Sequence, residues 1–207
     1  MTRTTPVFTT PASEQALQRV VIGLKGRNVE AVIVDTADEA RRLVSERLPQ
    51  GAEVYSGKSK TLQDAGIMDM VQDPRTYDAL RPRLLKMDRQ TQAREIRKLI
   101  AAPDFMLGSV NAVTEDGILV AASATASQLG PYAYTSGKLI LVIGSQKVVP
   151  DLETALRRIR EYVLPWEDQQ VRALVPTGSF VGKILIIERE WITGRVEVIL
   201  VRNPIGM

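Results

Sequence analysis

Residues 139–144 read LILVIG, an unbroken apolar run that ends in glycine. Such a run is typical of a strand buried on both faces, as in the centre of a parallel sheet. The chain continues with SQKVVP and then, from Asp151, with the most clearly marked helix of the sequence. Asp151 is a suitable N-cap, and apolar residues follow it at helical spacing, at Leu152, Ala155, Leu156, Ile159 and Val163. We expect Pro165 to end this helix, and the strand-to-helix order indicates an α/β fold.

Further apolar segments extend this pattern toward both ends of the chain. Helices are expected to begin at the N-cap residues Ser13 and Thr36, and another is expected over residues 93–100. Their alternation with strands predicts a sandwich with helices on both faces of a sheet. We expect one domain over residues 13–207, preceded by a mobile tail over residues 1–12. The expected strands are residues 29–35, 53–55, 105–110, 183–188 and 196–201, and residues 112–122, AVTEDGILVAA, are expected to form a hairpin.

The chain of 207 residues contains no cysteine and no histidine. It therefore cannot form disulfides, hold an iron–sulfur cluster through thiolates or use a thiolate nucleophile. It also lacks the commonest general base and the usual ligand of catalytic zinc. Catalysis would rest on carboxylates, lysine, arginine, tyrosine, hydroxyls, backbone amides or a bound cofactor. We therefore assign no metal ligands, although a hard cation held by carboxylates stays open, and the cofactor is unknown.

The N-terminal sequence MTRTTPVFTTPASEQ is polar where a secretion signal needs an apolar segment, and no apolar run is long enough to cross a membrane. We therefore expect a cytoplasmic protein without membrane attachment. The net charge of +3 comes from 27 basic and 24 acidic residues, which is close to balance. Basic residues gather over residues 73–98, but no aromatic platform accompanies them, so we interpret this segment as solvated surface and expect no nucleic-acid partner.

Four segments carry candidate site residues, and the first is GKSKT at residues 57–61. A glycine after a strand lets the backbone turn tightly, and the start of the next helix points free amides at an anion. Gly57, Lys58, Ser59 and Thr61 are therefore candidate ligands of a phosphate, a carboxylate or a nucleotide-like group. The spacing is not that of a P-loop. The alternative is a plain strand-to-helix turn capped by Ser59.

The second candidate segment is NAVTEDG at residues 111–117. Asn111 offers both a donor and an acceptor, and Glu115 precedes a turn glycine, Gly117, that would expose its carboxylate. Because the chain has no histidine, a carboxylate is the natural general base or nucleophile, so Glu115 is a candidate catalytic residue. The alternative is a hairpin in which the acidic residues only solvate the turn.

The third candidate segment is SATASQLGPYAYTSGK at residues 123–138, which is rich in small and hydroxyl-bearing residues. Small residues permit close approach of the backbone to a ligand, while Ser123, Thr125, Ser127 and Gln128 supply polar groups. The alternative is a tightly packed surface loop.

The fourth candidate segment follows the central strand, where Gly144 ends the apolar run and Lys147 comes three residues later. Open α/β sheets bind ligands at the carboxyl ends of their strands. Lys147 is therefore a candidate anion anchor, and the alternative is a loop lysine in solvent.

In their order and spacing, several of these segments resemble the lactate-utilisation (LUD) domain family. YSGKSKTLQDAGIMDMV at residues 55–71 is similar to the family's Gly-Ser-x-Thr-Leu segment and the helix after it. GSVNAVTEDGILV at residues 108–120 is similar to its Gly-x-Asn-Ala-Ile-x-Glu-x-Gly-x-Leu-Val segment. LILVIGSQKVVPDLETALRRIR at residues 139–160 is similar to its strand ending in Gly-x-x-Lys-Ile-Val and the helix that follows.

The resemblance implies a three-layer αβα sandwich like that of ribose-5-phosphate isomerase, glucosamine-6-phosphate deaminase and CoA transferases. It also implies an association with bacterial oxidation of L-lactate to pyruvate. In that three-protein system the other components carry the iron–sulfur clusters, so a chain without cysteine is similar to the cluster-free component. The implied partners are iron–sulfur lactate-oxidation proteins and a small anionic ligand, and a homo-oligomer stays open.

The chain departs from the family pattern at two places. Some relatives carry a cysteine-rich segment after the last long helix, where residues 166–183 here read WEDQQVRALVPTGSFVGK. The Asp-Gly-Thr-Gly-Asn-Arg segment of others stands here as SATASQ at residues 123–128, which removes an acid and a base. CoA transferases of this fold carry a nucleophilic glutamate in a Ser-Glu-Asn-Gly turn, and TEDG at residues 114–117 looks similar.

Three hypotheses follow. The first is a lactate-utilisation protein that binds a small anionic or nucleotide-like ligand in one cleft formed by all four segments, Glu115 included. The second is an enzyme of acyl or CoA transfer that uses Glu115 as its nucleophile. The third is a non-catalytic subunit that docks an iron–sulfur partner.

Overall fold

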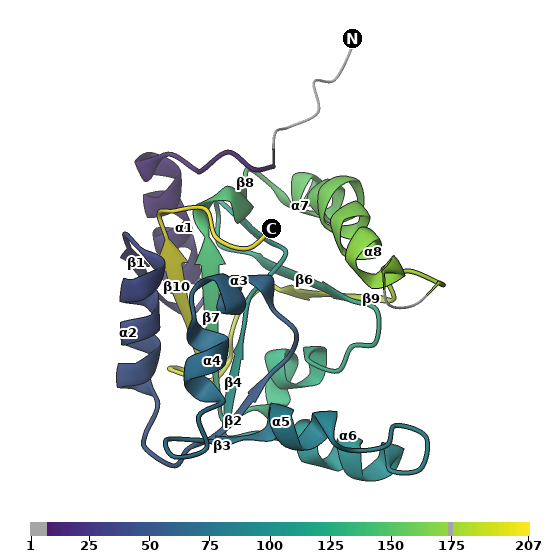
Figure 1. Ribbon diagram of the computed structural model, residues 1–207. Coiled ribbons are helices and arrows are strands. Elements are labelled where there is room, and N and C mark those ends of the chain that lie inside the picture. The colour runs from purple at the N-terminus through teal and green to yellow at the C-terminus, as the bar shows by residue number, and fades with distance from the viewer. Residues whose placement is uncertain (1–7, 174–175) are drawn as a thin grey trace.

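The computed structural model describes residues 8–173 and 176–207 of the chain. Its centre is a six-stranded sheet, called the main sheet, whose neighbouring strands are all parallel. In spatial order the strands are β1 (Glu30–Val34), β10 (Val196–Val201), β7 (Lys138–Gly144), β4 (Phe105–Gly108), β2 (Glu53–Ser56) and β3 (Asp78–Ala79). Strand β7 lies in the middle of this sheet, between β10 and β4 (Figure 1). The prediction from its apolar sequence is confirmed.

The side chains of β7 explain why its sequence is apolar throughout. Leu139, Leu141 and Ile143 point into the core on one face of the main sheet. Ile140 and Val142 point into the core on the other face. Successive residues of a strand face opposite sides, so a strand covered on both sides needs an apolar residue at every position.

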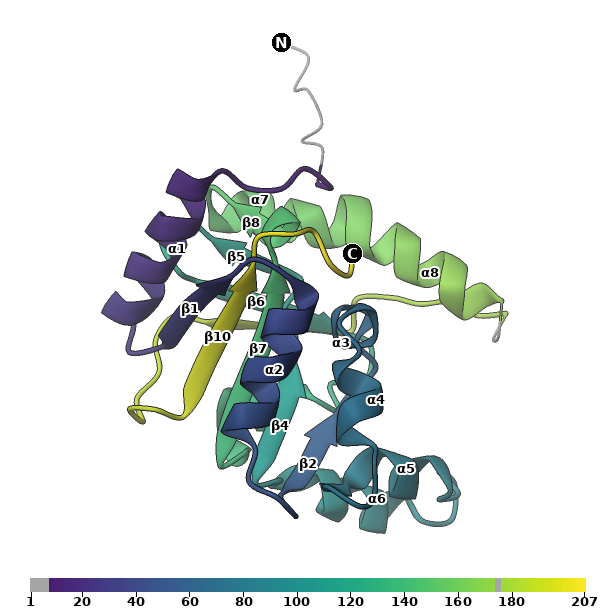
Figure 2. The same ribbon diagram turned by 60° about the vertical axis from the view of Figure 1, so that its left-hand side comes forward.

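Helices cover both faces of the main sheet, as the alternation of segments predicted. On one face lie α2 (Ala37–Arg47), α3 (Lys60–Asp64) and α4 (Ile67–Val71), which stand in front of the sheet in Figure 2. On the other face lie α1 (Glu14–Gly26), α5 (Leu80–Leu85) and α6 (Ala93–Ala101). The fold class is therefore α/β and agrees with the expected three-layer sandwich.

A second sheet, of four strands, packs beside α1 on the same face of the main sheet, and we call it the small sheet. It consists, in spatial order, of β8 (Val148–Val149), β5 (Ala112–Thr114), β6 (Leu119–Ser123) and β9 (Lys183–Ile187). Strands β5 and β6 form the hairpin expected over residues 112–122. The segments expected as the last two strands thus belong to different sheets, because β9 pairs with β6 and β10 pairs with β7.

Side-chain caps fix the starts of the three helices for which the sequence offered an N-cap residue. The hydroxyls of Ser13 and Thr36 accept from the backbone N–H groups of Ala16 and Glu39 at 3.2 Å in each case. The carboxylate of Asp151 accepts from the N–H of Thr154 at 2.7 Å. Each cap satisfies a donor that the first helical turn leaves free.

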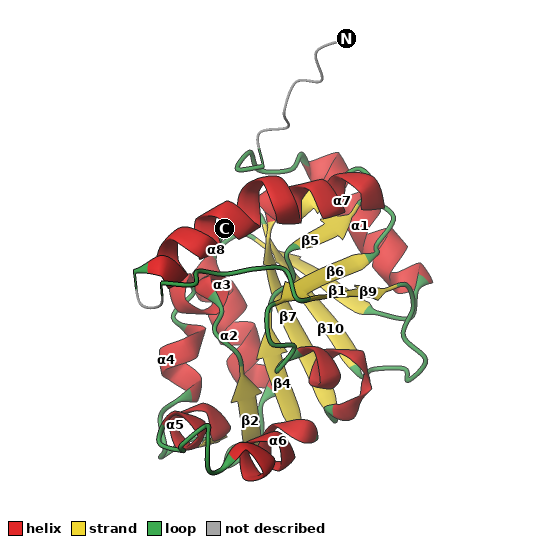
Figure 3. Ribbon diagram, turned by 90° about the vertical axis from the view of Figure 1, so that its right-hand side faces the viewer, coloured by secondary structure: helices red, strands yellow, loops and turns green. Residues whose placement is uncertain are grey.

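Pro165 does not end its helix, and this expectation was wrong. A continuous helical run includes α7 (Leu152–Arg158), a π-helical turn (Ile159–Val163) and α8 (Leu164–Arg172). The N–H of Leu164 donates to the carbonyl of Ile159, five residues back, and Pro165 occupies the first turn of α8. Because proline is tolerated in a first turn, the π-helical turn lets the chain continue. Helix α8 therefore extends over the end of the small sheet (Figure 3).

The N-terminal segment is only partly described. Residues 1–7 of the expected mobile tail lie outside the described residues. Phe8, which belongs to the same expected tail, is buried, and its ring centroid lies 6.2 Å from that of Tyr162. Among the described residues, no helix has the length and apolar character needed to cross a membrane.

Candidate functional site

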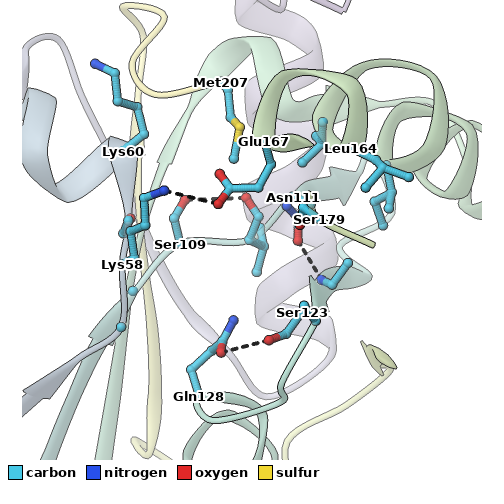
Figure 4. Close-up of a pocket in the computed structure, with 18 of the residues that line it drawn as sticks. Lys58, Lys60, Ser109, Asn111, Ser123, Gln128, Leu164, Glu167, Ser179 and Met207 are labelled. Atoms are coloured by element: carbon cyan, nitrogen blue, oxygen red, sulfur yellow. Dashed lines mark hydrogen bonds and ion pairs between the residues drawn. The ribbon is translucent and has the colours of Figure 1, made fainter. Parts of the chain in front are cut away.

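A cavity of about 300 Å³ opens beside the carboxyl ends of β2, β4 and β7. It lies between the main sheet, the end of β6 and helix α8, and Figure 4 shows it in close-up. This is the edge at which open α/β sheets bind ligands. Most residues selected from the sequence line it together: Gly57, Lys58, Ser59, Thr61, Asn111, Ser123, Thr125, Ser127, Gln128 and Lys147.

Lys147 lies in a short turn after β7, and only 3% of its surface is exposed. Its ammonium nitrogen donates to the hydroxyl of Thr61 at 2.7 Å, to the hydroxyl of Ser109 at 2.9 Å and to the carbonyl of Val110 at 3.2 Å. All three hydrogen-bond partners are neutral, so no carboxylate is in direct contact with the buried charge. The alternative of a loop lysine in solvent is thereby excluded.

The pKa of Lys147 is lowered from 10.5 to about 7. Burial is the largest cause, because it disfavours the charged form of an amine. The positive charge of Arg158 on α7 lowers this pKa further, while the carboxylate of Asp64 on α3 raises it. Near neutral pH the amine therefore exists in both its charged and its neutral form.

The turn at residues 57–61 contributes both structural and cavity-lining groups. The Ser59 hydroxyl caps α3 by accepting from the N–H of Leu62 at 3.3 Å, as the plain-turn alternative required. The same turn nevertheless lines the cavity and supplies the buried hydroxyl that Lys147 contacts. The ammonium of Lys58 reaches across to the carboxylate of Glu167 on α8, at 3.1 Å (Figure 4). This ion pair links the two sides of the cavity.

Asn111 is held at the cavity wall by both its side chain and its backbone. Its side-chain carbonyl accepts from the N–H of Ala122 at 2.5 Å, which leaves its amide NH₂ group for a ligand. Its backbone carbonyl accepts from the fully buried guanidinium of Arg158. The Cζ atom of Arg158 lies 5.2 Å from the ring centroid of Tyr162. Burial lowers the pKa of Arg158 to about 10.

The loop at residues 123–128 is shaped by its own side chains. The Ser123 hydroxyl accepts from the N–H of Ala126 at 2.9 Å and donates to the side-chain carbonyl of Gln128 at 3.1 Å. Ala126 has a φ of 66°, a left-handed conformation that a residue with a Cβ rarely adopts. The bond from Ser123 stabilises this turn and orients the amide NH₂ group of Gln128 for a ligand.

Ser109 follows β4 and is fixed by Tyr132. The Tyr132 hydroxyl accepts from the Ser109 N–H and donates to the Ser109 carbonyl, each at 3.1 Å. Gly108 makes this contact possible, because a Cβ at this position would overlap the Tyr132 hydroxyl. Tyr132 is fully buried, and burial raises the pKa of its hydroxyl. The phenol therefore stays protonated and acts as a fixed hydrogen-bonding group.

Glu115, Gly117 and Gly144 are not among the residues that line the cavity, so the structure does not bring Glu115 into one cleft with the other candidates. The Glu115 carboxylate pairs with Arg19 of α1, with 2.7 Å between Oε2 and Nε. Gly117 has a φ of 91° and packs on the backbone of α1. Gly144 lies against the backbone of Ile205 near the end of the chain. The two glycines thus allow close backbone packing, and Glu115 forms an ion pair outside the cavity.

Several cavity residues were not selected from the sequence. Ser109 follows β4 directly, and its place at the carboxyl end of a parallel strand was the available signal. Trp166 and Glu167 were missed because Pro165 was read as the end of their helix. Phe180 and Met207 come from irregular segments without a recognisable pattern.

The charged residues of the cavity favour an anion. Lys58, Lys60 and Lys147 line it, and Glu167 is the acidic residue among its lining side chains. Arg158 adds a buried positive charge behind the wall. In residues 8–173 and 176–207, no three acidic side chains gather as they would to hold a metal ion.

Comparisons with known proteins agree with this architecture. The profile of the LUD domain matches residues 17–201. No curated protein matches the chain. The crystal structure of a DUF162 family protein from Deinococcus radiodurans is similar with a TM-score of 0.55 and 11% identity, covering 92% of this chain and 99% of that chain. That of eIF2B delta from Chaetomium thermophilum has a TM-score of 0.37 and 12% identity, covering 67% of this chain and 57% of that one, which is too low a similarity to interpret.

Proposed function

The chain belongs to the LUD domain family, and on that premise we propose that it serves lactate utilisation by binding a small organic anion in the cavity beside Lys147. Family membership supports a role related to lactate utilisation in general. The identity of the ligand is the part that we add. L-Lactate and pyruvate are the first candidates, because both are small carboxylates.

Lys147 is the observation that carries this proposal. It is buried in a polar cavity, and its partners are two hydroxyls and a carbonyl. An anion that reaches this nitrogen would give the ammonium a negatively charged partner in direct contact, which its three protein partners do not provide. The amide NH₂ groups of Asn111 and Gln128 would donate to the other polar atoms of the ligand.

The size of the cavity leaves room for a larger anion. A volume of about 300 Å³ is at the lower end of the usual range for small-molecule sites and exceeds that of a three-carbon acid. A sugar phosphate or a nucleotide-like anion is therefore the alternative within the same proposal. The ion pair between Lys58 and Glu167 would open to admit the larger ligands.

A thermal-shift series tests the proposal. The melting temperature of the wild type, K147M and E115Q would be measured with L-lactate, pyruvate, glucose 6-phosphate and AMP. We expect at least one anion to raise the melting temperature of the wild type and of E115Q, but not that of K147M. Equal stabilisation of all three proteins, or of none, would refute binding at Lys147.

A second candidate function is docking of an iron–sulfur partner, and one observation favours it. Trp191 is 94% exposed in the connection between β9 and β10, and Ile192 beside it is also exposed. Large exposed aromatic residues are enriched at protein interfaces. We propose a cytoplasmic location for such a complex. Co-purification of the lactate-oxidation proteins with the wild type but not with W191S would support docking, and equal recovery would refute it.

Acyl or CoA transfer through Glu115 receives no support from the geometry. The carboxylate lies outside the cavity and is paired with Arg19. A nucleophile needs a substrate-binding surface around it.

A further inference from the structure

Ser109 and Lys147 form a pair that binding alone does not require. The Ser109 Oγ lies 2.9 Å from the Lys147 Nζ, and the Thr61 hydroxyl holds the same nitrogen from another side at 2.7 Å. A nucleophile, a base within hydrogen-bond reach and a third group that orients the base are the usual parts of nucleophilic catalysis. We propose that Ser109 is a nucleophile, activated by Lys147, that cleaves a small anionic ester or thioester. This inference rests on the proposed function for the negative charge of its substrate.

Ser109 differs from the other serines of the cavity in its partners. Ser59 caps α3, and Ser123 is used by Ala126 and Gln128. Ser127 contacts Gln128 at 3.4 Å. Among the described serines that line the cavity, only Ser109 is hydrogen-bonded to a lysine.

The position of Ser109 is fixed before any ligand binds. Tyr132 bonds both its N–H and its carbonyl, so the backbone cannot rotate without breaking two hydrogen bonds. Side-chain hydroxyls held on a rigid backbone react without reorganisation. The amide NH₂ group of Asn111 lines the same cavity and is the candidate donor to the oxyanion that forms during attack.

The base must be neutral to accept a proton. Because burial and the neighbouring charge of Arg158 hold the pKa of Lys147 at about 7, against the opposing effect of Asp64, roughly half of the amine is neutral at pH 7. An amine with an ordinary pKa would be almost fully protonated at this pH. The hydroxyls of Ser109 and Thr61 can either accept from the ammonium or donate to the amine, so both forms fit the site.

The chemical step balances without a further cofactor. The Ser109 oxygen bonds to the acyl carbon, its proton passes to the Lys147 nitrogen, and the bond from the acyl carbon to the leaving alcohol or thiol breaks. The lysine returns the proton to the leaving group. Water then cleaves the acyl-serine ester, which releases the acid and restores the hydroxyl.

A neutral fluorophosphonate tests the pair directly, because it reacts with activated serines and needs no anionic substrate. Full-length wild type, S109A, S45A and K147R would be treated with it and the labelled residue identified by mass spectrometry; Ser45 is an exposed serine of α2 that lies outside the cavity. We expect labelling of Ser109 in the wild type and in S45A, none at this position in S109A, and a rate at least about 100-fold lower in K147R. Labelling of another residue, or labelling of Ser109 at an equal rate in K147R, would overturn the proposal.

The pH dependence of the wild-type rate provides a test that needs no variant. We expect the labelling rate to rise with pH and to level off above a midpoint near 7, where Lys147 loses its proton. A rate that rises only above pH 9 would overturn the role of Lys147, because it would report an unactivated hydroxyl. Anion-induced thermal shifts of the same samples separate the two proposals. Retained anion binding without labelling refutes only the nucleophile. Labelling without anion binding refutes the proposed function and the negative charge assigned to the substrate, but leaves Ser109 as the nucleophile.

Discussion

The cavity around Lys147 and the hairpin turn at residues 115–117 both looked like sites in the sequence, but they have different structural roles. Each combines a strand with a following glycine and charged side chains. The cavity lies at the carboxyl ends of parallel strands and holds a buried lysine with neutral partners. At the hairpin turn, by contrast, the Glu115 carboxylate already has Arg19 as a partner, and the turn packs on α1. The comparison teaches that a buried lysine whose direct partners are all neutral is a stronger indication of a ligand site than an acid that already has an arginine partner.

The largest expected effect comes from the buried charge of the cavity. Replacing Lys147 with methionine removes an amine whose pKa is about 7 in the folded protein and 10.5 in the unfolded chain. Below pH 7 both states bind the proton, and the wild type bears the full cost of burying it. Between pH 7 and pH 10.5 the unfolded chain binds more protons than the folded protein, so the stability of the wild type rises with pH. We expect the stability of the wild type relative to K147M to increase by about 4 kcal/mol from pH 6 to pH 10.

Urea unfolding at a series of pH values measures this difference. The matched control is K58M, which removes an exposed lysine of the same cavity. K58M controls for the loss of a lysine side chain from the cavity wall, and it should not reproduce the difference expected for K147M. A flat difference for K147M would show that the amine is not buried as described.

The next largest effect tests the packing role of the hairpin turn. In Gly23→Ala, the new Cβ would lie 2.3 Å from the backbone carbonyl carbon of Asp116. We expect a loss of about 3 kcal/mol in unfolding free energy, because two backbones would have to separate. Gly26→Ala on the same helix meets no atom within 4 Å and should stabilise by up to about 1 kcal/mol. Equal effects of the two substitutions would remove the packing argument.

How much of the structure could be predicted from the sequence depends on the length of each strand and on whether its contacts are local. The strand at residues 139–144 was predictable because every position must be apolar when both faces are buried. The hairpin of β5 and β6 was also predicted, but its place in a separate sheet with β8 and β9 was not. Strand β8 has two residues, too few to show a period, and a local pattern does not encode which strands pair. The burial of Lys147 arises from contacts with distant residues, Thr61 and Ser109, that no local pattern encodes.

A smaller effect is expected in the cavity loop. Ser123→Ala removes the bond to the N–H of Ala126, whose backbone is left-handed. We expect a loss of about 1 kcal/mol in unfolding free energy and weaker anion binding. Ser127→Ala, whose hydroxyl contacts its neighbours at 3.4 Å, is the control and should cost less. If Ser127→Ala costs as much, the loop is not held by Ser123.

The smallest effect is expected at the hairpin acid. Glu115→Gln loses an ion pair in which Arg19 is half exposed, and such exposed pairs contribute little to stability. Its anion binding should equal that of the wild type. A loss of binding in this variant would reverse the comparison between the two regions.

Amide chemical-shift mapping of the ¹⁵N-labelled protein during titration with L-lactate tests most directly which region binds the ligand. We predict that the largest shifts fall on Ser109, Asn111 and Lys147, with saturation at a common dissociation constant. Largest shifts at residues 114–117, or no site-specific shifts at all, would contradict the assignment of the cavity as a lactate site.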